Sequence, residues 1–470
     1  MVYQICVKLT LIKSVSGFRG TIGGKPGDNL SPVDIVNLTS SYAKWLLENT
    51  VGKPTVVTGR DGRISGEAVL NMVNSTLALC GIDVINCDLS TTPSVEMAVL
   101  RKKADGGIIC TASHNPMEWN ALKLLNSRGE FISPEEGQKI VKMSEQLDMT
   151  YADVKDIGSI QAYPTSMEDH IREVLAMDLV DSELVNGQNW RVVVDGINST
   201  GAMIIPQLLK YMGVEFLLLN GNNFGHFAHN AEPLPENLTD LAEKTKQSNA
   251  ILGIAVDPDV DRLVFIDENG EPFGEEYTLV AIADYYLREK GTGDTVSNLS
   301  SSMALTKVTE KHGGKHYQSA VGERHVVDEM KKRKALIGGE GNGGIICPEL
   351  HYGRDAVAGL ALFLTFLAKT GNTPSALRAQ YPHFEMAKEK IRLEGTSDID
   401  KLLEEIKNQY SSKEQDSTDG LKIYFDNAWC HIRKSNTEPI LRIYTEAGDS
   451  KKATDLAEQL IKDIEQLKNK

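Results

Sequence analysis

Three aspartates occupy alternate positions in the segment Asp257-Pro-Asp-Val-Asp-Arg262, which separates two apolar runs, 250–256 and 263–266. Carboxylates spaced in this way within a turn can converge on one hard cation, and oxygen ligands favour Mg²⁺ or Ca²⁺ over softer metals. An EF-hand loop is the main alternative, because Glu268 falls at its twelfth position. That loop needs a glycine at its sixth position, however, where this chain has Arg262, and strand-like runs flank the segment. We therefore predict a catalytic Mg²⁺ site.

The segment Thr111-Ala-Ser-His-Asn-Pro116 is a second candidate for chemistry, and it follows the strand-like run 107–110. Serine and asparagine before proline are common in turns, and His114 could simply bind a loop carbonyl. The adjacency of Ser113 and His114 is therefore weak evidence for a nucleophile. Small residues beside Ser113 leave its hydroxyl accessible, as a hydroxyl that carries a phosphoryl group must be. The segment is compatible with phosphoryl transfer without establishing it.

Two further segments have the composition of ligand-binding loops. In Gly338-Gly-Glu-Gly-Asn-Gly-Gly344, glycines let the backbone approach a ligand, while Glu340 and Asn342 can bind hydroxyl groups. Such a loop can equally be structural. In His431-Ile-Arg-Lys-Ser-Asn-Thr-Glu-Pro439, an arginine, two hydroxyls, an amide and loop N–H groups can together hold a phosphate dianion. We expect a phosphate site there, because a solvated hairpin does not need this mixture.

The chain has 470 residues, a length that allows about three compact units, with two or four equally admissible. Its hydrophobic and charged contents, 41% and 24%, are those of a folded, water-soluble protein. The net charge of −15 opposes binding to nucleic acid or anionic membranes over most of the surface. The six cysteines are scattered without a CxxC pair, which indicates neither disulfides nor a zinc site and favours the cytoplasm. The longest apolar run, 356–368, is too short to span a membrane and predicts a buried core helix.

A strand, a tight turn and a helix follow one another at three places, which predicts α/β domains with largely parallel sheets. The elements expected there are a strand at 54–58 with a helix to about 80, a strand at 191–195 with a helix to 212, and a strand at 295–299 with a helix to about 312. The last hundred residues predict an α+β unit instead. Its expected strands are 390–394, 421–425, 430–434 and 440–445, its helices are 398–409 and 450–468, and a polar loop covers 410–420.

Taken together and in this order, the four segments resemble the α-D-phosphohexomutase family. TASHNP is similar to the family's phosphoserine loop, DPDVDR to its metal loop, GEGNGG to its sugar loop and RKSNTEP to its phosphate loop. The resemblance begins at Ser16-Gly-Phe-Arg-Gly20, which looks like the N-terminal arginine loop, and covers nearly the whole chain. It implies three similar α/β domains with mixed, largely parallel sheets and a C-terminal α+β domain like the TATA-binding protein, around a central cleft. The expected domain boundaries are 1–157, 158–270, 271–373 and 374–470.

The resemblance also implies roles for individual residues. Ser113 is expected to be phosphorylated and to complete the metal site through a phosphoryl oxygen. The expected Mg²⁺ ligands are Ser113, Asp257, Asp259 and Asp261. The residues expected near the transferring phosphoryl group are Arg19, His114 and Lys123. The residues expected to bind the substrate are Arg262, Arg324, Glu340, Asn342, Arg433, Ser435, Asn436 and Thr437.

The expected reaction interconverts a hexose 6-phosphate and a hexose 1-phosphate through phosphoserine 113 and a hexose 1,6-bisphosphate, which also serves as activator. Many bacterial relatives end the sugar loop in Ser-Gly-His, whereas this chain has Asn342-Gly-Gly344, so the general base is left unassigned. This form of the loop looks most like archaeal-type phosphoglucosamine mutases. Glucosamine phosphate is therefore the expected substrate and glucose or mannose phosphate the alternative, although no single residue distinguishes the three sugars.

Two other classes of function compete with a mutase. A metal-dependent sugar phosphatase would use Ser113 only transiently, but the His-rich site for two metals is missing. A non-catalytic sugar-phosphate binder would keep RKSNTEP and could dispense with the serine and the aspartates, all of which are present. We therefore expect an isomerase whose partner is a small phosphosugar, with no nucleic acid and no membrane. The sequence leaves open whether it is a monomer or a dimer.

Overall fold

The structure is a computed structural model that describes residues 9–14, 17–146, 148–392, 399–434 and 440–468. The chain folds into two compact units. The first consists of Met1–Thr278 and Gly343–Ser375, and the second of Leu279–Asn342 and Ala376–Lys470. None of the helices in the described ranges combines the length and the apolar composition that crossing a bilayer requires.

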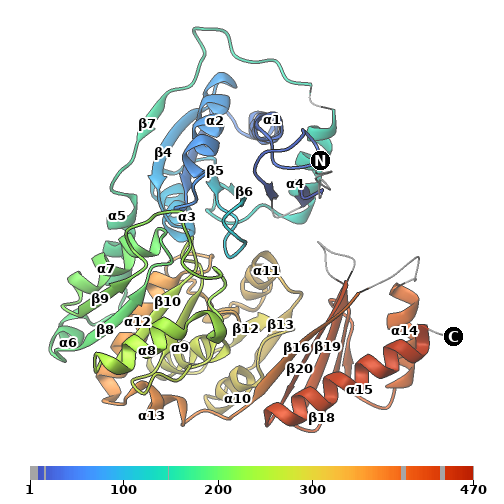
Figure 1. Ribbon diagram of the computed structural model, residues 1–470. Helices are drawn as coiled ribbons and strands as arrows, with labels where there is room; N and C mark the ends of the chain where they lie inside the picture. Colours follow the sequence, from blue (N-terminus) through green and yellow to red (C-terminus); the bar gives the residue numbers. More distant parts are fainter. Residues whose placement is uncertain (1–8, 15–16, 147, 393–398, 435–439, 469–470) are drawn as a thin grey trace, which may run out of the picture. The chain divides into compact units, whose positions relative to one another are not determined.

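A seven-stranded mixed sheet forms the N-terminal part of the first unit (Figure 1). The strand order is β1-β2-β6-β5-β3-β4-β7, with parallel pairing among β5, β3, β4 and β7 and antiparallel pairing elsewhere. The strands are β1 (Ile12–Ser14), β2 (Gly17–Thr21), β3 (Thr55–Arg60), β4 (Asp83–Leu89), β5 (Gly106–Cys110), β6 (Trp119–Asn126) and β7 (Ile160–Ala162). The helices are α1 (Pro32–Asn49), α2 (Gly66–Leu79), α3 (Thr92–Lys102) and α4 (Pro134–Glu145).

The two faces of this sheet bury different side chains, because successive residues of a strand point to opposite faces. Val56 and Ile108 pack in one core cluster with α1, α2 and α4, whereas their neighbours Val57 and Ile109 pack in another with α3. Strand β5 is therefore buried along its whole length, as expected for a strand covered on both faces. The loop that follows β5 starts from the rigid centre of the sheet.

The rest of the first unit contains a four-stranded sheet in the order β11-β10-β8-β9, in which β11 is antiparallel to β10 and the other pairs are parallel. Phe363 of α12 stacks on Phe265 of β11, with the ring centroids 4.0 Å apart. This stacking packs the C-terminal segment of the unit against the sheet. The elements are α5 (Ser166–Leu175), α6 (Ser182–Asn186), β8 (Arg191–Asp195), α7 (Gly201–Tyr211), β9 (Glu215–Leu219), a 3-10 helix (Pro235–Asn237), α8 (Thr239–Gln247), β10 (Leu252–Val256), β11 (Leu263–Ile266), β15 (Gly344–Ile346) and α12 (Ala356–Thr370).

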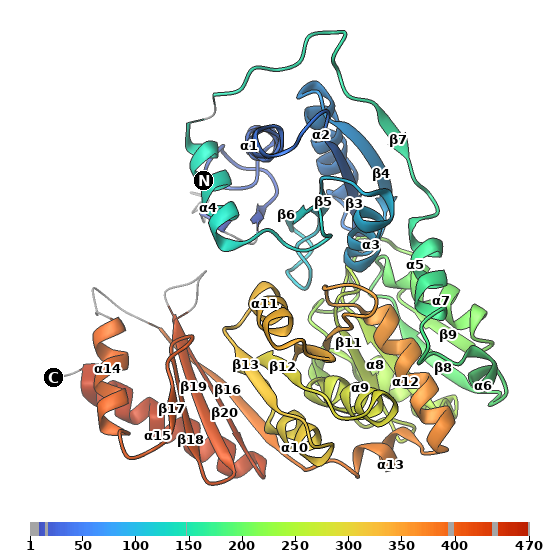
Figure 2. The same cartoon turned by 180° about the vertical axis from the view of Figure 1, so that it is seen from behind.

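The second unit contains three parallel strands, with β12 between β13 and β14, and a five-stranded antiparallel sheet in the order β16-β20-β19-β18-β17. Helices α14 and α15 pack on one face of the antiparallel sheet, as both views show (Figures 1 and 2). Helices α9 and α13 begin just before this unit's two segments and are counted with it. The elements are α9 (Glu275–Lys290), β12 (Thr295–Asn298), α10 (Met303–Lys311), β13 (His316–Ser319), α11 (Glu323–Arg333), β14 (Ile337–Glu340), α13 (Pro374–Arg378), β16 (Glu385–Arg392), α14 (Ile399–Gln409), β17 (Gln415–Asp416), β18 (Leu421–Phe425), β19 (Ala428–Lys434), β20 (Ile440–Ala447) and α15 (Ser450–Lys468).

Buried polar side chains join the two sheets within the second unit. Lys422 on β18 is fully buried and donates from Nζ to the carbonyl oxygen of Leu299 at 2.6 Å. His431 on β19 is bonded at both ring nitrogens, with Nδ1 2.8 Å from Ser300 Oγ and Nε2 donating to the carbonyl oxygen of Asp419 at 2.6 Å. Because an unsatisfied buried polar group costs about 1–3 kcal/mol, these bonds hold the two sheets together.

The predicted fold class is confirmed, and most predicted elements match the structure closely. The strands at 191–195 and 421–425 are β8 and β18, and the predicted core helix is α12, which is buried from Ala356 to Leu367. Two local predictions are wrong. The strand expected at 390–394 is β16, which starts at Glu385 because it pairs along its whole length with β20, and the expected polar loop contains the short strand β17. Both strands are defined by pairing with a distant segment, which local composition does not reveal.

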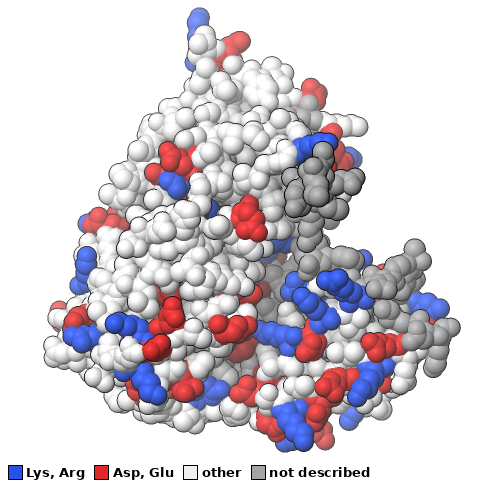
Figure 3. Space-filling model, in the orientation of Figure 1, with Lys and Arg blue, Asp and Glu red and all other residues white. Residues whose placement is uncertain are grey.

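Acidic and basic side chains are intermixed on the face drawn in Figure 3. Neighbouring charges of opposite sign weaken the field that a surface presents to a polyanion.

Acid should destabilise the second unit through His431. Burial lowers the pKa of this imidazole to about 4, although its hydrogen bond to the Asp419 carbonyl acts in the opposite direction. Because the folded pKa lies below the usual value of about 6.5, the unfolded chain takes up a proton that the folded chain does not as the pH falls from about 6.5 to 4. We expect this group to lower the free energy of unfolding by at most about 3 kcal/mol over that range.

Urea unfolding between about pH 7 and pH 4.5 measures this decline. The free energy of unfolding of a His431→Gln variant should decline less steeply as the pH falls. The difference in slope corresponds to the uptake of up to one proton per molecule on unfolding. An equally steep decline in the variant would contradict the assignment.

Candidate active site

Ser113 lies in the loop that follows the buried strand β5. Its side chain is largely buried, and its Oγ donates to Asp257 Oδ2 at 2.6 Å. Its backbone has φ +48°, a left-handed conformation that costs a residue with a Cβ roughly 1–2 kcal/mol. A strained residue persists only where its surroundings impose the conformation. The loop is therefore constrained to hold this hydroxyl beside the aspartates.

The three aspartates lie in the loop between β10 and β11, and all three are fully buried. Asp257 Oδ1 accepts from the backbone N–H groups of Asp261 and Arg262, both at 3.1 Å. Val260 has φ +63°, which is unusual for a β-branched residue. The resulting turn brings ligand atoms of the three aspartates within 4.8 Å of one another. The structure thus brings together the three carboxylates that the sequence predicts as a set.

Gathering three carboxylates in the interior shifts their protonation. Burial, together with the charges of the other two aspartates, holds the pKa of Asp257 well above its usual range. Burial also acts to raise the pKa of Asp259, but the ammonium group of Lys123, 2.7 Å from Asp259 Oδ2, outweighs it and lowers that pKa. In turn, the carboxylates raise the pKa of Lys123 although burial opposes this. Lys123 is therefore a cation at neutral pH.

The donor atoms of the cluster fit a hard cation. Asp259 Oδ1 and Asp261 Oδ1 are buried and have no hydrogen-bond partner among the residues that the structure describes. Leaving buried acceptors unsatisfied is costly, so a missing partner is expected for both. A divalent cation would satisfy both oxygens, and a set of carboxylate ligands is typical of Mg²⁺ sites.

His114 and Lys123 differ in charge. His114 Nδ1 lies 3.4 Å from Ser113 Oγ. Burial holds the pKa of His114 well below its usual value, and the positive charges of Arg262 and Arg354 lower it further. The imidazole is therefore neutral at neutral pH and can accept a proton, whereas the lysine can only stabilise negative charge.

The buried guanidinium of Arg63 organises the loop around Ser113. Its Nε donates to Asp61 Oδ2 at 3.0 Å. Its terminal nitrogens donate to four carbonyl oxygens of the loop, those of Ser113, Asn115, Pro116 and Trp119. Only arginine offers five donors in a fixed planar fork that can serve so many acceptors at once. The loop is thus wrapped around one cation, which holds the backbone of Ser113 in its left-handed conformation.

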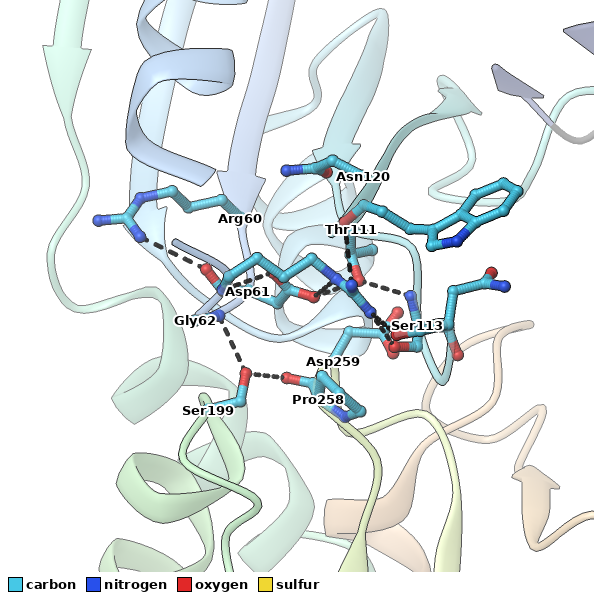
Figure 4. Close-up of polar contacts among 12 residues, drawn as sticks. Arg60, Asp61, Gly62, Thr111, Ser113, Asn120, Ser199, Pro258 and Asp259 are labelled. Carbon is cyan, nitrogen blue, oxygen red and sulfur yellow. Dashed lines mark hydrogen bonds and ion pairs between the residues drawn. The ribbon is translucent and has the colours of Figure 1, made fainter. Parts of the chain in front are cut away.

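The turn that contains Arg63 also connects this loop to the aspartates (Figure 4). Thr111, at the start of the loop, donates from Oγ1 to Asp61 Oδ2 at 2.7 Å. Gly62 N donates to Ser199 Oγ at 2.9 Å, and Ser199 Oγ donates to the carbonyl oxygen of Pro258 at 2.6 Å. A Cβ on Gly62 would lie 2.8 Å from the Cα of Ser199, so a larger residue would push the two loops apart.

Two predicted arginines lie in the first unit. Arg19 on β2 pairs with Ala121 on β6, so it lies on the same face of the sheet as Lys123, two residues further along β6. Arg262 follows the last aspartate, and its Nη1 lies 3.3 Å from Glu232 Oε1.

Glu340 ends strand β14 in the second unit and is buried. Its Oε1 accepts from Asn298 Nδ2 at 3.0 Å and from the N–H of Gly322 at 3.1 Å. Gly322 is the N-cap of α11 and has φ +123°, a conformation that favours glycine. The carboxylate therefore lies at the positive end of a helix, which stabilises its negative charge.

Two other predicted substrate-binding residues also lie in the second unit. Arg324, in the first turn of α11, pairs with Asp328 through Nε at 3.1 Å and Nη2 at 2.7 Å. Asn342 is half-buried and is the last residue of the segment Leu279–Asn342.

Arg433 lies on β19 directly opposite Arg442 on β20. Like charges at opposite positions of two strands repel each other. Arg433 Nη1 is 3.6 Å from Asp419 Oδ2, and the Nε atoms of both arginines are buried with no hydrogen-bond partner in the described ranges. The remaining predicted phosphate ligands, Ser435, Asn436 and Thr437, lie outside the described residues.

Sequence models of the phosphoglucomutase/phosphomannomutase domains match successive parts of the chain. Alpha/beta/alpha domain I matches residues 11–150, domain II matches 168–270, domain III matches 274–384 and the C-terminal domain matches 388–463. A phosphoglucomutase/phosphomannomutase of Thermococcus kodakarensis is 34% identical over 454 residues, which cover 95% of this chain and 98% of that protein. The chain belongs to this family, the α-D-phosphohexomutases.

Further relatives agree with this assignment. A protein of Methanopyrus kandleri named "Probable phosphoglucosamine mutase" is 32% identical, over 95% of this chain and 96% of that protein. A crystal structure of a phosphoglucomutase/phosphomannomutase family protein from Burkholderia thailandensis has the same fold, with 22% identity and a TM-score of 0.83 over 98% of each chain. The resemblance drawn from the four segments is confirmed, and the phosphohexomutase is an isomerase.

Several residues at the candidate site were not predicted from sequence. Arg354 Nη2 donates to Asp261 Oδ2 at 2.7 Å, and Thr92 Oγ1 donates to Asp259 Oδ2 at 2.6 Å. Neither residue lies in one of the four segments. Arg63 belongs to a turn in which the sequence indicates only a strand-to-helix connection, although two arginines and an aspartate in five residues are a signal that could have identified it.

Replacing Arg63 by lysine should lower kcat about 100-fold and leave KM nearly unchanged. A lysine ammonium cannot serve four carbonyl oxygens and Asp61 together, and a misplacement of about 1 Å at a reacting group costs roughly that factor. Steady-state kinetics separates the two parameters, and thermal unfolding shows whether the variant is folded.

The matched control is Arg191→Lys, at the start of β8 in the same unit. Arg191 pairs with Glu215, the two side chains are 45% and 62% exposed, and an exposed ion pair contributes little. The control should retain wild-type kinetics. Equal kcat for both variants would contradict the positioning role of Arg63.

Proposed function

We propose that this protein interconverts a hexose 6-phosphate and a hexose 1-phosphate through phosphoserine 113 and a hexose 1,6-bisphosphate. The observation that carries the proposal is the 2.6 Å hydrogen bond between Ser113 Oγ and Asp257 within the set of three buried aspartates. The phosphoryl group on a serine is a dianion, and its charge must be neutralised at the place where it is transferred. The hydroxyl of such a serine must therefore lie beside a cation site, as Ser113 Oγ does beside the aspartates.

Cations around Ser113 support phosphoryl transfer. Mg²⁺ bound by the three aspartates and a phosphoryl oxygen of Ser113 would neutralise charge on the transferring group. Lys123 is held as a cation by Asp259 and Asp261 and adds a second positive charge. Arg19, on the same face of the sheet, adds a third. A phosphate monoester dianion repels nucleophiles, so this excess of positive charge favours attack on phosphorus.

The reaction has two half-steps that exchange one phosphoryl group each. In the first, the O–P bond at Ser113 breaks, a free sugar hydroxyl forms the new O–P bond, and the proton of that hydroxyl passes to the departing Ser113 Oγ. In the second, Ser113 Oγ attacks the other phosphate of the bisphosphate, and the departing sugar oxygen takes up a proton. The Ser113 hydroxyl donates to Asp257 Oδ2, but Asp257 would be a ligand of Mg²⁺ in this step. We therefore assign the proton of Ser113 to the neutral Nδ1 of His114, which lies 3.4 Å from the oxygen.

We assign the substrate's resident phosphate to the arginine pair of the second unit. Arg433 and Arg442 face each other with buried Nε atoms, and an anion between them would convert their repulsion into attraction. Arg324 and the predicted ligands Ser435, Asn436 and Thr437 would complete this site. Glu340 and Asn342 would bind the sugar hydroxyls.

Glucosamine phosphate is our proposed substrate. The ending Asn342-Gly-Gly344 of the sugar loop supports it, as does the name of the Methanopyrus kandleri relative. The Thermococcus kodakarensis relative, named phosphoglucomutase/phosphomannomutase, makes glucose or mannose phosphate the second candidate. We place the enzyme in the cytoplasm, because the described cysteines are free thiols that persist best in a reducing compartment.

Alanine in place of Ser113 should abolish mutase turnover and leave the fold intact, because only the hydroxyl group is removed. Mass spectrometry of the wild-type protein should show a phosphoryl group on Ser113 that the variant lacks. Ser411→Ala, at an exposed serine, is the control and should behave as wild type. Full turnover by Ser113→Ala would refute the phosphoserine mechanism, and release of inorganic phosphate without isomerisation by the wild type would favour a phosphatase.

A comparison of the 6-phosphates of glucosamine, glucose and mannose tests the substrate. Each is assayed with Mg²⁺ and its matching 1,6-bisphosphate. We expect kcat/KM for glucosamine 6-phosphate to exceed the others at least tenfold, which corresponds to about 1.4 kcal/mol of discrimination. A higher value for glucose or mannose 6-phosphate would instead support a general phosphohexomutase.

A further inference from the structure

A second set of metal-ligating side chains lies in the first unit, outside the aspartate cluster. His170, His351 and Asp355 have ligand atoms within 4.8 Å of one another. Asp355 Oδ2 is at the centre, 2.8 Å from His170 Nε2 and 3.2 Å from His351 Nε2. All three residues are buried, with exposures of 1%, 4% and 1%. The three donor atoms therefore converge in a place that solvent does not reach.

Each of these side chains is held by another partner on its far side. His170 Nδ1 lies 2.9 Å from Ser94 Oγ, and His351 Nδ1 lies 3.3 Å from Glu96 Oε2. Asp355 Oδ1 accepts two backbone N–H groups at the start of α12, at 2.8 and 3.1 Å. Histidines that bind metals in proteins nearly always have such a partner on the second nitrogen, which fixes the orientation of the ring.

Both ring nitrogens of His170 have a partner. Ser94 Oγ, which accepts from Thr91 Oγ1 at 2.7 Å, lies 2.9 Å from Nδ1, and Asp355 Oδ2 lies 2.8 Å from Nε2. The orientation of the imidazole is therefore fixed, with Nε2 directed at the centre of the cluster.

Two buried carboxylates lie beside the imidazole of His351. Asp355 Oδ2 is 3.2 Å from Nε2, and Glu96 Oε2 is 3.3 Å from Nδ1. Buried carboxylates are unfavourable unless a positive charge lies beside them. A cation among these side chains would therefore be stabilised.

We propose that His170, His351 and Asp355 supply three ligands of a site for a divalent transition-metal ion of the Zn²⁺ type, with Ser94 and Glu96 orienting the two imidazoles. Two imidazole nitrogens and one carboxylate oxygen favour such ions over Mg²⁺. In a tetrahedral site with bonds of about 2.0–2.1 Å, ligand atoms are about 3.3 Å apart. The observed separations of 2.8 and 3.2 Å need only small shifts to reach this geometry.

Protons compete with the metal for the same atoms. A bound metal needs a lone pair on Nε2 of His170 and on Nε2 of His351, so a proton on either nitrogen must leave for solvent or be replaced by one on Nδ1 of the same ring. Without a metal, the same side chains form an ion-pair network.

The site connects three segments that are distant in the sequence: helix α3, helix α5 and the residues before α12. Gly353 allows the close approach, because a Cβ there would lie 1.9 Å from Glu96 Oε2. Arg354, next to Asp355, bonds to Asp261 in the loop of three aspartates. A metal at this site would thus also stabilise the position of Arg354, the arginine that bonds to the loop of three aspartates.

The test is the metal content of the full-length protein after growth in zinc-supplemented medium and purification without a metal-affinity step. We expect one equivalent of zinc per chain in the wild type and in Asp257→Asn, which alters the aspartate cluster. His351→Gln should lose the zinc, whereas His325→Gln, at an exposed histidine of α11, should retain it. Glu96→Gln should weaken zinc binding by about 10- to 100-fold without removing a ligand.

X-ray absorption at the zinc edge of the wild-type protein makes the test independent of whether His351→Gln folds. Scattering from two imidazoles is expected. A wild-type protein without zinc would show that the cluster is only an ion-pair network. Zinc with oxygen ligands alone, or zinc lost from Asp257→Asn but kept in Glu96→Gln with unchanged affinity, would equally overturn the proposal.

Discussion

The burial of three carboxylates in one short loop is the constraint on which the candidate site depends. Three like charges in the interior are unfavourable, and the structure compensates with Lys123, Arg354 and Thr92, which bond to Asp259 and Asp261. Two carboxylate oxygens still have no partner in the described part of the chain. The loop is thus preorganised for a cation, because a cation satisfies the remaining oxygens and relieves the repulsion at the same time.

A second constraint is the strained backbone of Ser113. The left-handed conformation is maintained by Arg63, whose guanidinium gathers the carbonyl groups of the loop, and by Gly62, which reaches the metal loop through Ser199. One buried arginine and one glycine therefore fix the distance between the hydroxyl and the aspartates. Precision at the reacting atoms comes from a turn that contributes no reacting group.

Much of the fold and of the site could be predicted from the sequence. The four segments are recognisable because each holds its functional residues within one short loop. These residues are the serine with its neighbours, the three aspartates, the glycines around Glu340, and the phosphate-binding residues. Partners such as Arg354 could not be predicted, because they meet the loops only through tertiary packing. Strand β16 was misplaced for the same reason, since its range is set by pairing with β20 and not by local composition.

The sequence by itself determined the class of chemistry, the family and the alternation of strands and helices, because these depend on residue types and short spacings. Only the tertiary structure decided which charges neutralise one another. It made His114 neutral and Lys123 a cation, although both are basic residues near one serine, because burial and the neighbouring charges set the two pKa values in opposite directions. It also brought His170 to Asp355, 185 residues apart, because three helices pack at one place.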